Sequence, residues 1–501
     1  MLNLKDSIMK KNYFDARVGL LSLATIAMGT LFFGSCVDGY DKESWDNGVR
    51  NQVLESPDAS QIVVTPSSDG SKTTITWPVV MGAGGYICSV NNVTDPSAPI
   101  ELVKDTLIDG CSITVPRAED TNYQFLIKSA ANASRNNQES ETPSEVAFTS
   151  FTPTYGSIPA GSDLTEWFAA NPLPDDKAGE MLCYDLVPGG EYTLSGKLDF
   201  TNHQVTLRTT NPNNPAKITY SSEDASIKST SFFTLKNLVF DASASKSPFI
   251  ELDSTPDESI KAATGKGDYY NIMGTISITG CKIDGVNNNL VYDGNKKYCV
   301  ETLLINNSVI HLTSSKETSI SGNAVIYFKT GYANTLTVKN STIWNSGDSD
   351  AKYLVQYNNS GRCDRAGYTK NEIDFISCTF YNVAKAGQWG NYSGFAGRST
   401  SYWVMTNNIF VDCGSKQICR RFLGGRGNQT TATFGNNTYM INGEFESTGG
   451  MVESYDKSGT AIEEDPQFAD AANGDFHISG ATQVAKKTGD PRWLPVAEEN
   501  N

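Results

Sequence analysis

Histidine, paired cysteines and positive charge are scarce in this sequence. Among 501 residues there are three histidines, and Lys and Arg number 40 against 56 for Asp and Glu, giving a formal net charge of −16. Three histidines are too few for a multi-histidine zinc site. The sequence also contains no CxxC motif, which argues against a thiolate metal site. The acidic balance argues against nucleic acid as a partner, because phosphate binding needs a basic surface.

The cysteines do not form a disulfide pattern. Nine of them follow Cys36, which is an odd number, and their spacing is irregular. Disulfide-rich domains instead show even numbers at regular spacings. Cys413 and Cys419 could pair, but a pairing cannot be deduced from the sequence alone.

The first 36 residues have the layout of an export signal. Basic residues at positions 10, 11 and 17 precede an apolar run at 18–33, and two small residues then precede Cys36. This order is typical of a secretory signal peptide. The small pair before Cys36 resembles the lipobox of bacterial lipoproteins, which implies that Cys36 is acylated and anchors the chain in a membrane. The alternative is a plain signal peptide with an incidental cysteine.

Residues 37–54 form a short acidic segment that begins with Asp38 and Asp41. The segment resembles the acidic export signal of Bacteroidetes lipoproteins. That resemblance implies a location on the cell surface, at the outer face of the outer membrane. A solvated tether is the alternative interpretation.

Residues 55–150 are predicted to form a separate all-β domain. Short runs of alternating apolar and polar residues, such as Thr73–Trp77 and Tyr123–Ser129, are separated by Gly, Pro, Asp and Asn. Trp77, then Tyr86, then Tyr123 on a late strand resemble the core of a fibronectin type III sandwich. We expect these rings to be core residues and the domain to act as a spacer.

Residues 155–495 contain one phrase seven times, made of an apolar residue, a gap, a small polar pair and a second apolar residue. Successive copies start 43, 27, 33, 37, 30 and 29 residues apart. A fixed phrase at variable intervals is typical of a solenoid, in which coils stack and insertions leave from loops. The long first interval predicts an inserted loop at about 244–270. The copies start at Leu235, Ile278, Ile305, Val338, Phe375, Met405 and Phe434.

The third residue of the phrase predicts a turn between two sheets. It is Asn or Gly in six copies and Ser377 in the remaining one, and Asn and Gly adopt a left-handed backbone at low cost. Flanking apolar residues would then point inward, and stacked asparagines would hydrogen-bond along the axis. This pattern resembles the pectate-lyase-like superfamily, which implies a right-handed parallel β-helix.

Two further segments complete the predicted fold. A short helix at Asp163–Ala170 is expected to cover the first coil, and residues 465–493 resemble the C-terminal closure of bacterial proteins of this type. The predicted fold class is therefore all-β, with an N-terminal fibronectin type III-like β-sandwich followed by a right-handed parallel β-helix.

Residues 362–426 reverse the charge of the chain, with nine basic residues against four acids. Such an excess attracts an anionic ligand. A uronate lyase needs a cation beside the carboxylate, a base and help for the departing oxygen, and resemblance to β-helix lyases implies Arg or Lys as the base. The alternative is that these are loop cations balancing surface acids. The candidate catalytic residues are Lys385, Arg398, Lys416, Arg420 and Arg421, and the candidate substrate-binding residues are Trp389, Tyr392, Trp403 and Arg426.

The phrase register also predicts neighbours on consecutive coils. Lys385 and Lys416 lie 10 and 11 residues after their phrase starts, whereas Arg398 and Arg426 lie seven and eight residues before theirs. Each pair is therefore expected to lie on adjacent coils.

Acidic side chains in one register raise the question of calcium, the one cofactor expected here. Asp241 and Asp284 both lie six residues after a phrase start, with His311 at the same place on the next coil. Their oxygens could bind Ca²⁺, and a solvated polar ladder is the alternative. No catalytic motif of the best-known pectate lyases or of polygalacturonases is found.

The function predicted from these features is a surface lipoprotein that engages an acidic, pectin-like polysaccharide. Cleavage by β-elimination and binding without cleavage both remain open, and an adhesin or spacer is the third alternative. We expect a monomer or a component of a glycan-uptake assembly.

Overall fold

The computed structural model describes residues 48–68, 70–262, 268–314, 324–348, 351–358, 368–392, 394, 399–424 and 429–496. The chain divides into two units, Met1–Thr152 and Pro153–Asn501, and each is described by itself. Cys36 and the signal segment lie outside the described residues. Within the described ranges, no helix combines the length and the apolar character needed to cross a bilayer.

The first unit is built from two antiparallel sheets around one core. One sheet has three strands in the order β1-β2-β5 and the other has four in the order β4-β3-β6-β7. Trp77, Tyr86 and Tyr123 are buried in the shared core, as expected from the sequence, and the Trp77 ring lies 5.6 Å from that of Tyr86. The strands are β1 (Val63–Pro66), β2 (Lys72–Thr76), β3 (Tyr86–Asn92), β4 (Ile100–Ile108), β5 (Ser112–Pro116), β6 (Asn122–Ser129) and β7 (Ser144–Thr149).

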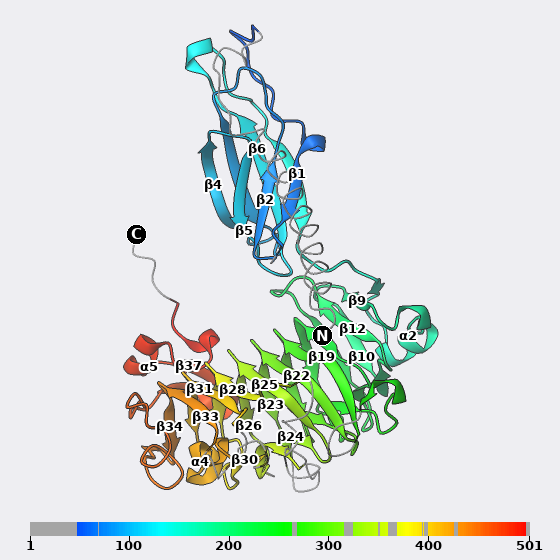
Figure 1. Cartoon of the computed structure of the whole chain (residues 1–501), viewed down its shortest axis with the longest axis vertical. Coiled ribbons are helices and arrows are strands. Elements are labelled where there is room, and N and C mark those ends of the chain that lie inside the picture. Colours follow the sequence, from blue (N-terminus) through cyan, green and yellow to red (C-terminus); the bar gives the residue numbers. More distant parts are fainter. Residues whose placement is uncertain are drawn as a thin grey trace, which may run out of the picture. The chain divides into compact units, whose positions relative to one another are not determined.

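The second unit is a parallel β-helix, whose stacked strands are visible in Figure 1. A coil passes in turn through three sheets, here named C, A and B. Sheet A contains β10 (Glu191–Leu194), β13 (Ala216–Tyr220), β16 (Leu238–Asp241), β20 (Lys282–Val286), β23 (Val309–Leu312), β26 (Thr342–Asn345), β29 (Thr379–Tyr381), β32 (Ile409–Val411), β34 (Thr438–Ile441) and, antiparallel to it, β35 (Glu444–Phe445).

Sheet B is the shortest of the three. Its strands are β11 (Lys197–Asp199), β14 (Ser226–Ser229), β17 (Ile250–Leu252), β21 (Val291–Tyr292), β24 (Ala324–Phe328), β27 (Tyr353–Tyr357) and β30 (Trp389–Asn391). The strand β17 lies inside the predicted insertion at 244–270, so the residues that leave the coil begin after it.

Sheet C is the longest and supplies the strand before each turn to sheet A. Its strands are β8 (Gly156–Ile158), β9 (Met181–Leu186), β12 (Gln204–Thr209), β15 (Phe233–Lys236), β18 (Lys261–Ala262), β19 (Tyr269–Thr279), β22 (Tyr298–Asn306), β25 (Tyr332–Lys339), β28 (Glu372–Ile376), β31 (Tyr402–Thr406) and β33 (Thr431–Gly435).

The repeated phrase forms the turn between sheets C and A. All seven turn residues have positive φ, from +47° at Asn307 to +67° at Gly280, and Ser377 at +52° is among them. This confirms the predicted left-handed turn. One pair of turn asparagines bonds along the axis, since Asn436 Nδ2 donates to Asn407 Oδ1 at 3.0 Å, whereas Asn237 Nδ2 donates to the Thr209 carbonyl and Asn307 Oδ1 accepts from Arg492. One fixed turn per coil keeps the flanking apolar residues pointing into the core.

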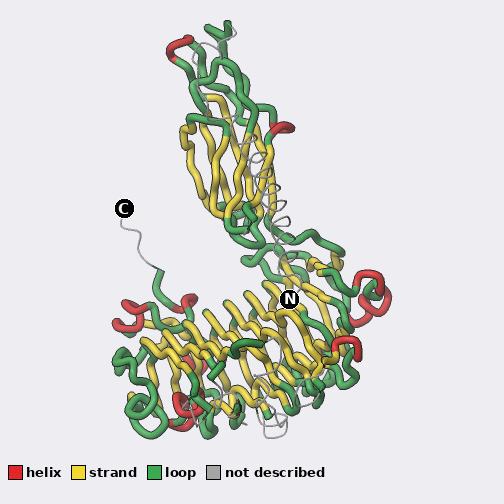
Figure 2. The backbone as a smooth tube through the Cα atoms, viewed as in Figure 1, coloured by secondary structure: helices red, strands yellow, loops and turns green. Residues whose placement is uncertain are grey.

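Short helices lie at the edges of the unit (Figure 2). The predicted helix is present as α2 (Leu164–Ala170), capped by Asp163, whose side chain accepts from Glu166 N–H at 3.1 Å. Leu164 and Phe168 are buried against the first coils. The other described helices of this unit are α4 (Ile418–Phe422), α5 (Ala481–Lys486), η3 (Asp175–Lys177), η4 (Glu258–Ile260), η6 (Gly414–Lys416), η7 (Ala471–Asn473) and η8 (Pro491–Trp493), whereas η1 (Ala59–Gln61) and η2 (Ala133–Arg135) belong to the first unit.

After the two-stranded ribbon of β36 (Phe468–Asp470) and β37 (Asp475–Ile478), the chain runs back along the turns. Residues 488–493, here named the strap, contact successively earlier coils. Thr488 bonds to Asn436 O at 3.3 Å, Gly489 N–H to Asn407 O at 2.8 Å, Asp490 N–H to Thr379 Oγ1 at 3.1 Å, and Arg492 to Asn307 Oδ1 at 2.9 Å. The strap therefore lies lengthwise along the coils, where the sequence suggested only closure of the end.

Candidate functional site

The outer face of sheet B carries one continuous row of polar and aromatic side chains. The strand registers pair each member with the next, and the residues between them, such as Ile227 and Val291, are buried in the core. Because strands in a sheet lie about 4.8 Å apart, seven members extend over about 29 Å. The sheet B row consists of Asp199, Lys228, Glu251, Tyr292, Tyr327, Gln356 and Asn391.

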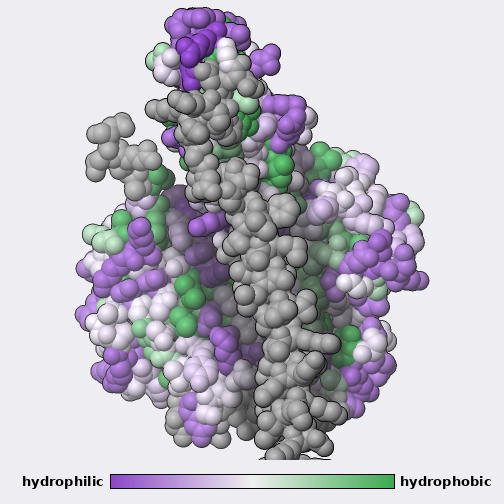
Figure 3. All heavy atoms as spheres, turned by 45° about the horizontal axis from the view of Figure 1, so that its top comes forward, coloured by the Kyte–Doolittle hydropathy of each residue, from purple (hydrophilic) through white to green (hydrophobic). Residues whose placement is uncertain are grey.

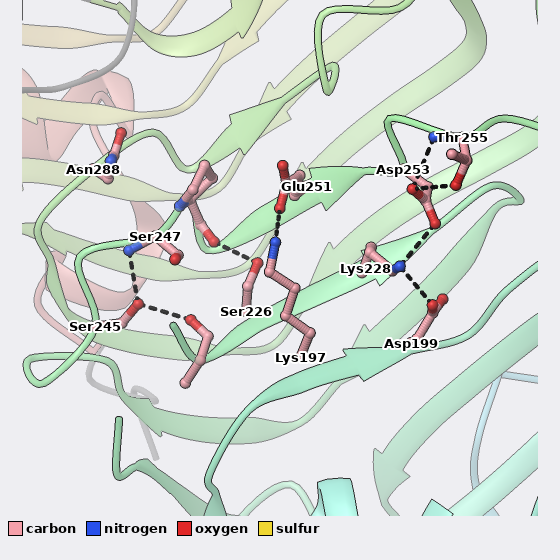
Figure 4. Close-up of polar contacts among 12 residues, drawn as sticks. Lys197, Asp199, Ser226, Lys228, Ser245, Ser247, Glu251, Asp253, Thr255 and Asn288 are labelled. Atoms are coloured by element: carbon pink, nitrogen blue, oxygen red, sulfur yellow. Dashed lines mark hydrogen bonds and ion pairs between the residues drawn. The ribbon is translucent and has the colours of Figure 1, made fainter. Parts of the chain in front are cut away.

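The first half of the sheet B row is a charge network (Figure 4). Lys228 Nζ lies 2.8 Å from carboxylate oxygens of both Asp199 and Asp253, and Lys197 Nζ lies 2.8 Å from Glu251 Oε2. Burial opposes ionisation of Asp253, but the bonds from Lys228 and Thr255 outweigh it and leave its pKa below the usual value. Lys228 thus favours the ionised form of Asp253, and the two lysines fix the positions of the neighbouring carboxylates.

The second half of the sheet B row is aromatic and amide-rich. The rings of Tyr292 and Tyr327 stack with centroids 5.8 Å apart and planes 21° apart. Tyr327 Oη accepts from Asn358 Nδ2 at 3.4 Å, and Gln356 Nε2 donates to Asn358 Oδ1 at 2.7 Å. Burial raises the pKa of both tyrosines. Tyr327 is only 6% exposed, so Tyr292 is the tyrosine of this pair that a ligand can reach. Beside the row, Lys352 Nζ lies 5.5 Å from the ring centroid of Tyr353.

The sequence prediction missed the sheet B row because the repeated phrase marks only the turn between sheets C and A. A weaker signal was present. The segments Leu290-Val291-Tyr292 and Val325-Ile326-Tyr327 place a tyrosine after two apolar residues on consecutive coils.

The predicted catalytic lysines are engaged by carboxylates. Lys385 Nζ lies 3.2 Å from Asp412 Oδ2, and Lys416 Nζ lies 2.5 Å from Glu446 Oε2. The N–H of Gly414 donates to Ala384 O at 3.0 Å, so the segments that carry the two lysines adjoin, as the register predicted. Each lysine nevertheless has its charge balanced locally.

The predicted arginines do not form one described cluster. Arg420 and Arg421 lie on α4, where Arg421 Nε donates to Gln417 Oε1 at 3.3 Å and Arg420 is exposed. Arg398 and Arg426 fall outside the described residues, and the pair predicted from them remains a prediction.

The aromatic residues predicted to stack on sugars lie in the core. Trp389 and Trp403 are each 1% exposed and Tyr392 is fully buried. The Trp389 ring packs 5.0 Å from that of Phe380, and Trp403 donates from its indole N–H to Asn371 Oδ1 at 3.0 Å. These rings have no face open to a ligand, which corrects the proposed substrate-binding role.

The acidic register predicted for calcium is present as a row on sheet A. Asp241 and Asp284 are register partners, but each is engaged elsewhere. Asp241 Oδ1 accepts from the Ser243 hydroxyl at 2.6 Å, and Asp284 Oδ1 lies 2.5 Å from His311 Nδ1. Among the described residues, no group of three or more His, Cys, Asp or Glu side chains is placed to hold a metal ion.

The candidate disulfide does not form. Cys419 is a buried free thiol on α4, and the Cys413 sulfur lies 3.2 Å from Val411 O. Burial raises the thiol pKa of Cys281 to about 12, and Cys281 and Cys378 both pack at the turns, as expected for small core residues.

Comparison with known families gives three matches to domains of unknown function. DUF4992 matches residues 9–188, DUF4957 matches 190–346 and DUF5123 matches 373–493. The first match includes the two-sheet unit and continues through β9, and the other two divide the β-helix. No curated protein matches the chain.

Among solved structures, the chain is similar to pectate lyase PelI from Erwinia chrysanthemi. The complex of that enzyme with tetragalacturonic acid shows 11% identity and a TM-score of 0.19, covering 64% of this chain and 83% of that one. A second structure of the same enzyme gives 13% identity, a TM-score of 0.18 and coverages of 64% and 84%. At these scores the likeness says nothing about the residues of a site.

Proposed function

We propose that the protein binds an extended polysaccharide along the outer face of sheet B and does not cleave it. The observation that carries the proposal is the sheet B row, a register of hydrogen-bonding and aromatic groups over seven consecutive strands. A polymer with a regular repeat can meet such a row at several points, whereas a small ligand would use only one or two members. The Tyr292 ring, which stacks on the buried Tyr327, and the amides of Gln356 and Asn391 suit the mixed apolar and hydroxyl surface of sugars.

Charge pairing favours binding over β-elimination. In the part of the chain that the structure describes, Lys385 and Lys416 are held by Asp412 and Glu446, and Lys228 is held by two carboxylates. A lyase base must be free to take a proton from the sugar. We propose an acidic, pectin-like polymer as the ligand, and the binding assay below tests it against a neutral polymer.

Surface character supports an exposed role. The face in Figure 3 is mainly hydrophilic, with small and separated hydrophobic spots, as expected for a surface that stays in contact with water. We further propose lipid attachment at Cys36 and an outer-membrane location. The first unit would be a fibronectin type III-like spacer, consistent with its sheet orders and with the Tyr123 hydroxyl that accepts from Ala118 N–H at 2.8 Å.

Native gels containing polysaccharide test the proposal. The protein should migrate more slowly in gels with polygalacturonate or a neutral β-glucan than in plain gels, and the more retarding polymer identifies the ligand class. Incubation with polygalacturonate and Ca²⁺ should give no unsaturated product absorbing in the ultraviolet. Product formation that depends on the protein would show a lyase and overturn the non-catalytic proposal.

Two variants test whether the polysaccharide binds on sheet B. Tyr292→Ala in the middle of the row and Asn391→Ala at its end should each weaken binding about 3–10-fold, the effect of losing roughly 1 kcal/mol of contact. Tyr402→Ala is the matched control, because this tyrosine is 47% exposed and lies on sheet C. Equal binding by all four proteins would exclude the sheet B row as the binding surface.

Labelling with a radioactive fatty acid tests the anchor. Label should enter the wild-type chain in the bacterial cell and be absent from a Cys36→Ser variant. Label of equal intensity in both would exclude Cys36 as the acylated residue.

A further inference from the structure

We propose that Ser346, His311 and Asp284 form a serine-nucleophile site on the outer face of sheet A, which hydrolyses esters of short carboxylic acids. The His311 ring connects the other two side chains. Its Nδ1 lies 2.5 Å from Asp284 Oδ1, and its Nε2 lies 2.7 Å from Ser346 Oγ. This is the arrangement of nucleophile, base and orienting carboxylate that activates serine. The site is separate from the sheet B row and does not depend on the proposed glycan binding.

Three neighbouring strands hold the site by their registers. Asp284 lies on β20, His311 on β23, and Ser346 directly follows β26, where His311 pairs with Trp344. The backbone at Ser346 is bonded to the preceding coil, because the Ser346 N–H donates to Leu312 O at 3.1 Å. The serine is exposed, while the His311 side chain is only 17% exposed. A reagent can therefore reach the nucleophile while the base is sheltered.

The two contacts of the ring are compatible with the proton positions that a general base needs. A carboxylate oxygen accepts hydrogen bonds, so in this arrangement the Nδ1–H of His311 donates to Asp284. The neutral ring then has its lone pair on Nε2, and the Ser346 hydroxyl must donate to it. This tautomer is the one that a general base needs.

The indole of Trp344 fixes the plane of the imidazole. The two rings lie parallel, with centroids 3.6 Å apart and an interplanar angle of 1°. Trp344 is in turn packed edge-on against Phe476, at 5.8 Å. Stacking on one side and two hydrogen bonds at the ring edge leave the base one orientation, which is the preorganisation that catalysis requires.

The reaction follows from these positions. Ser346 Oγ attacks the ester carbonyl as its proton passes to His311 Nε2, the bond to the alcohol oxygen breaks, and the alcohol leaves with that proton. Water then attacks the acyl-serine, gives its proton to His311, and releases the carboxylic acid as the serine hydroxyl is restored. The Gly347 N–H, next to the nucleophile, donates to Asn345 Oδ1 at 2.9 Å, and it could donate to the developing oxyanion instead.

The surroundings point to a short acyl group on a large alcohol. A long acyl chain needs an apolar channel, but the neighbouring ring of Trp344 is covered by His311 and packed against Phe476. The exposed position of Ser346, at the end of a strand, is open to an ester carried on a polymer. An O-acetylated chain fits this description.

A fluorophosphonate probe tests for the activated serine. Its phosphorus should bond to Ser346 Oγ with loss of fluoride, and peptide mass mapping of the full chain should place the label on that residue. p-Nitrophenyl acetate should be hydrolysed faster than the octanoate ester. His311→Gln should lower both rates about 100-fold or more, the usual contribution of a general base.

Matched serine variants make the test decisive. Ser346→Ala should abolish labelling and hydrolysis. Ser243→Ala should leave both unchanged, because Ser243 is also exposed and bonds to the sheet A residue Asp241, but has no histidine partner. Asp284 is a positioning residue, so Asp284→Asn should lower the rates and Asp284→Glu should restore part of them.

Label on another serine, no label at all, or equal hydrolysis by the Ser346→Ala and Ser243→Ala proteins would overturn the proposal. The melting temperatures of the variants test whether unfolding causes a loss of activity. They should stay close to that of the wild type, because surface serine changes alter stability by about 0.5 kcal/mol or less.

Discussion

Replacing Asp374 by Asn is expected to stabilise the β-helix at neutral pH. Asp374 lies on β28, half-buried, and its Oδ1 accepts from Val404 N–H at 3.0 Å. Burial, with a further contribution from the nearby charge of Glu372, raises its pKa from 3.8 to about 6. Asn keeps the shape and the acceptor oxygen but carries no charge.

The sign and size of the effect follow from proton linkage. The folded chain keeps this proton up to about pH 6, whereas the unfolded chain loses it near pH 3.8. Folding stability therefore falls as the pH rises from about 4 to about 6, and the loss is complete above that range. Since one pKa unit corresponds to about 1.4 kcal/mol, the full cost is about 3 kcal/mol. Water contact of this half-buried side chain reduces it to about 1–2 kcal/mol.

Urea unfolding followed by tryptophan fluorescence measures this difference, and the buried indole of Trp403 lies next to Val404. Asp374→Asn should unfold at higher urea at pH 7.5, and the difference from the wild type should shrink to about a third at pH 4.5. Asp412→Asn is the contrasting control, because it breaks the ion pair with Lys385 and should not stabilise. A less stable Asp374→Asn protein at pH 7.5, or an equal difference at both pH values, would refute the reasoning.

Three further substitutions test the turn, the cap and the strap. Asn407→Ala should lower the free energy of unfolding by about 1–2 kcal/mol, because alanine disfavours the φ of +56° at this turn. Asn407→Gly should lower it less, and thermal denaturation of the two variants measures the difference. Phe168→Ala should lower the free energy of unfolding by about 3–4 kcal/mol, because it leaves a cavity under α2. Limited proteolysis should then cut the first coils. Glu166→Ala, on the exposed side of α2, is the control and should leave the proteolysis pattern unchanged. Trp493→Phe removes an indole hydrogen bond of 2.8 Å to Thr342 Oγ1 and should cost about 1 kcal/mol, with faster hydrogen exchange in β26. Unchanged exchange there would show that the bond contributes nothing.

The turn between sheets C and A was predictable because its chemistry is local. A left-handed residue selects Asn or Gly whatever the rest of the chain does, so the phrase gave the coil register directly. Ser377 shows how firmly the coils impose this geometry, since it takes the same conformation as its asparagine counterparts, with φ of +52°. The cap helix was predictable for the same reason, from the Asp163 side chain and the apolar spacing.

The direction of side chains in sheet B was not predictable from the phrase. Variable loops separate the sheet B strands from the turns, so the phrase gives no register for Trp389, which was selected only as an aromatic residue within the basic segment. That residue was placed on the surface, yet it packs in the core with Phe375 and Phe410. The ion pair of Lys416 was not predictable either, because its partner Glu446 lies 30 residues away in the sequence.

The serine site was within reach of the sequence but was not recognised. Asp284, His311 and Trp344 all lie six residues after their phrase starts, and Ser346 lies eight after its own. The register therefore contained the row, but only the structure shows that His311 turns its Nε2 toward Ser346 and stacks on Trp344.

The strap changes the order in which the β-helix can become stable. Coils of a solenoid contact only their neighbours, so unfolding can begin at an end and spread. Arg492 and Asn307, however, are 185 residues apart in sequence, and Thr342 and Asp490 are 148 apart. During synthesis these coils leave the ribosome long before the residues that join them. Contacts of such long range slow folding, so we expect the coils to form early, fray readily, and gain their full resistance to unfolding only when the strap docks.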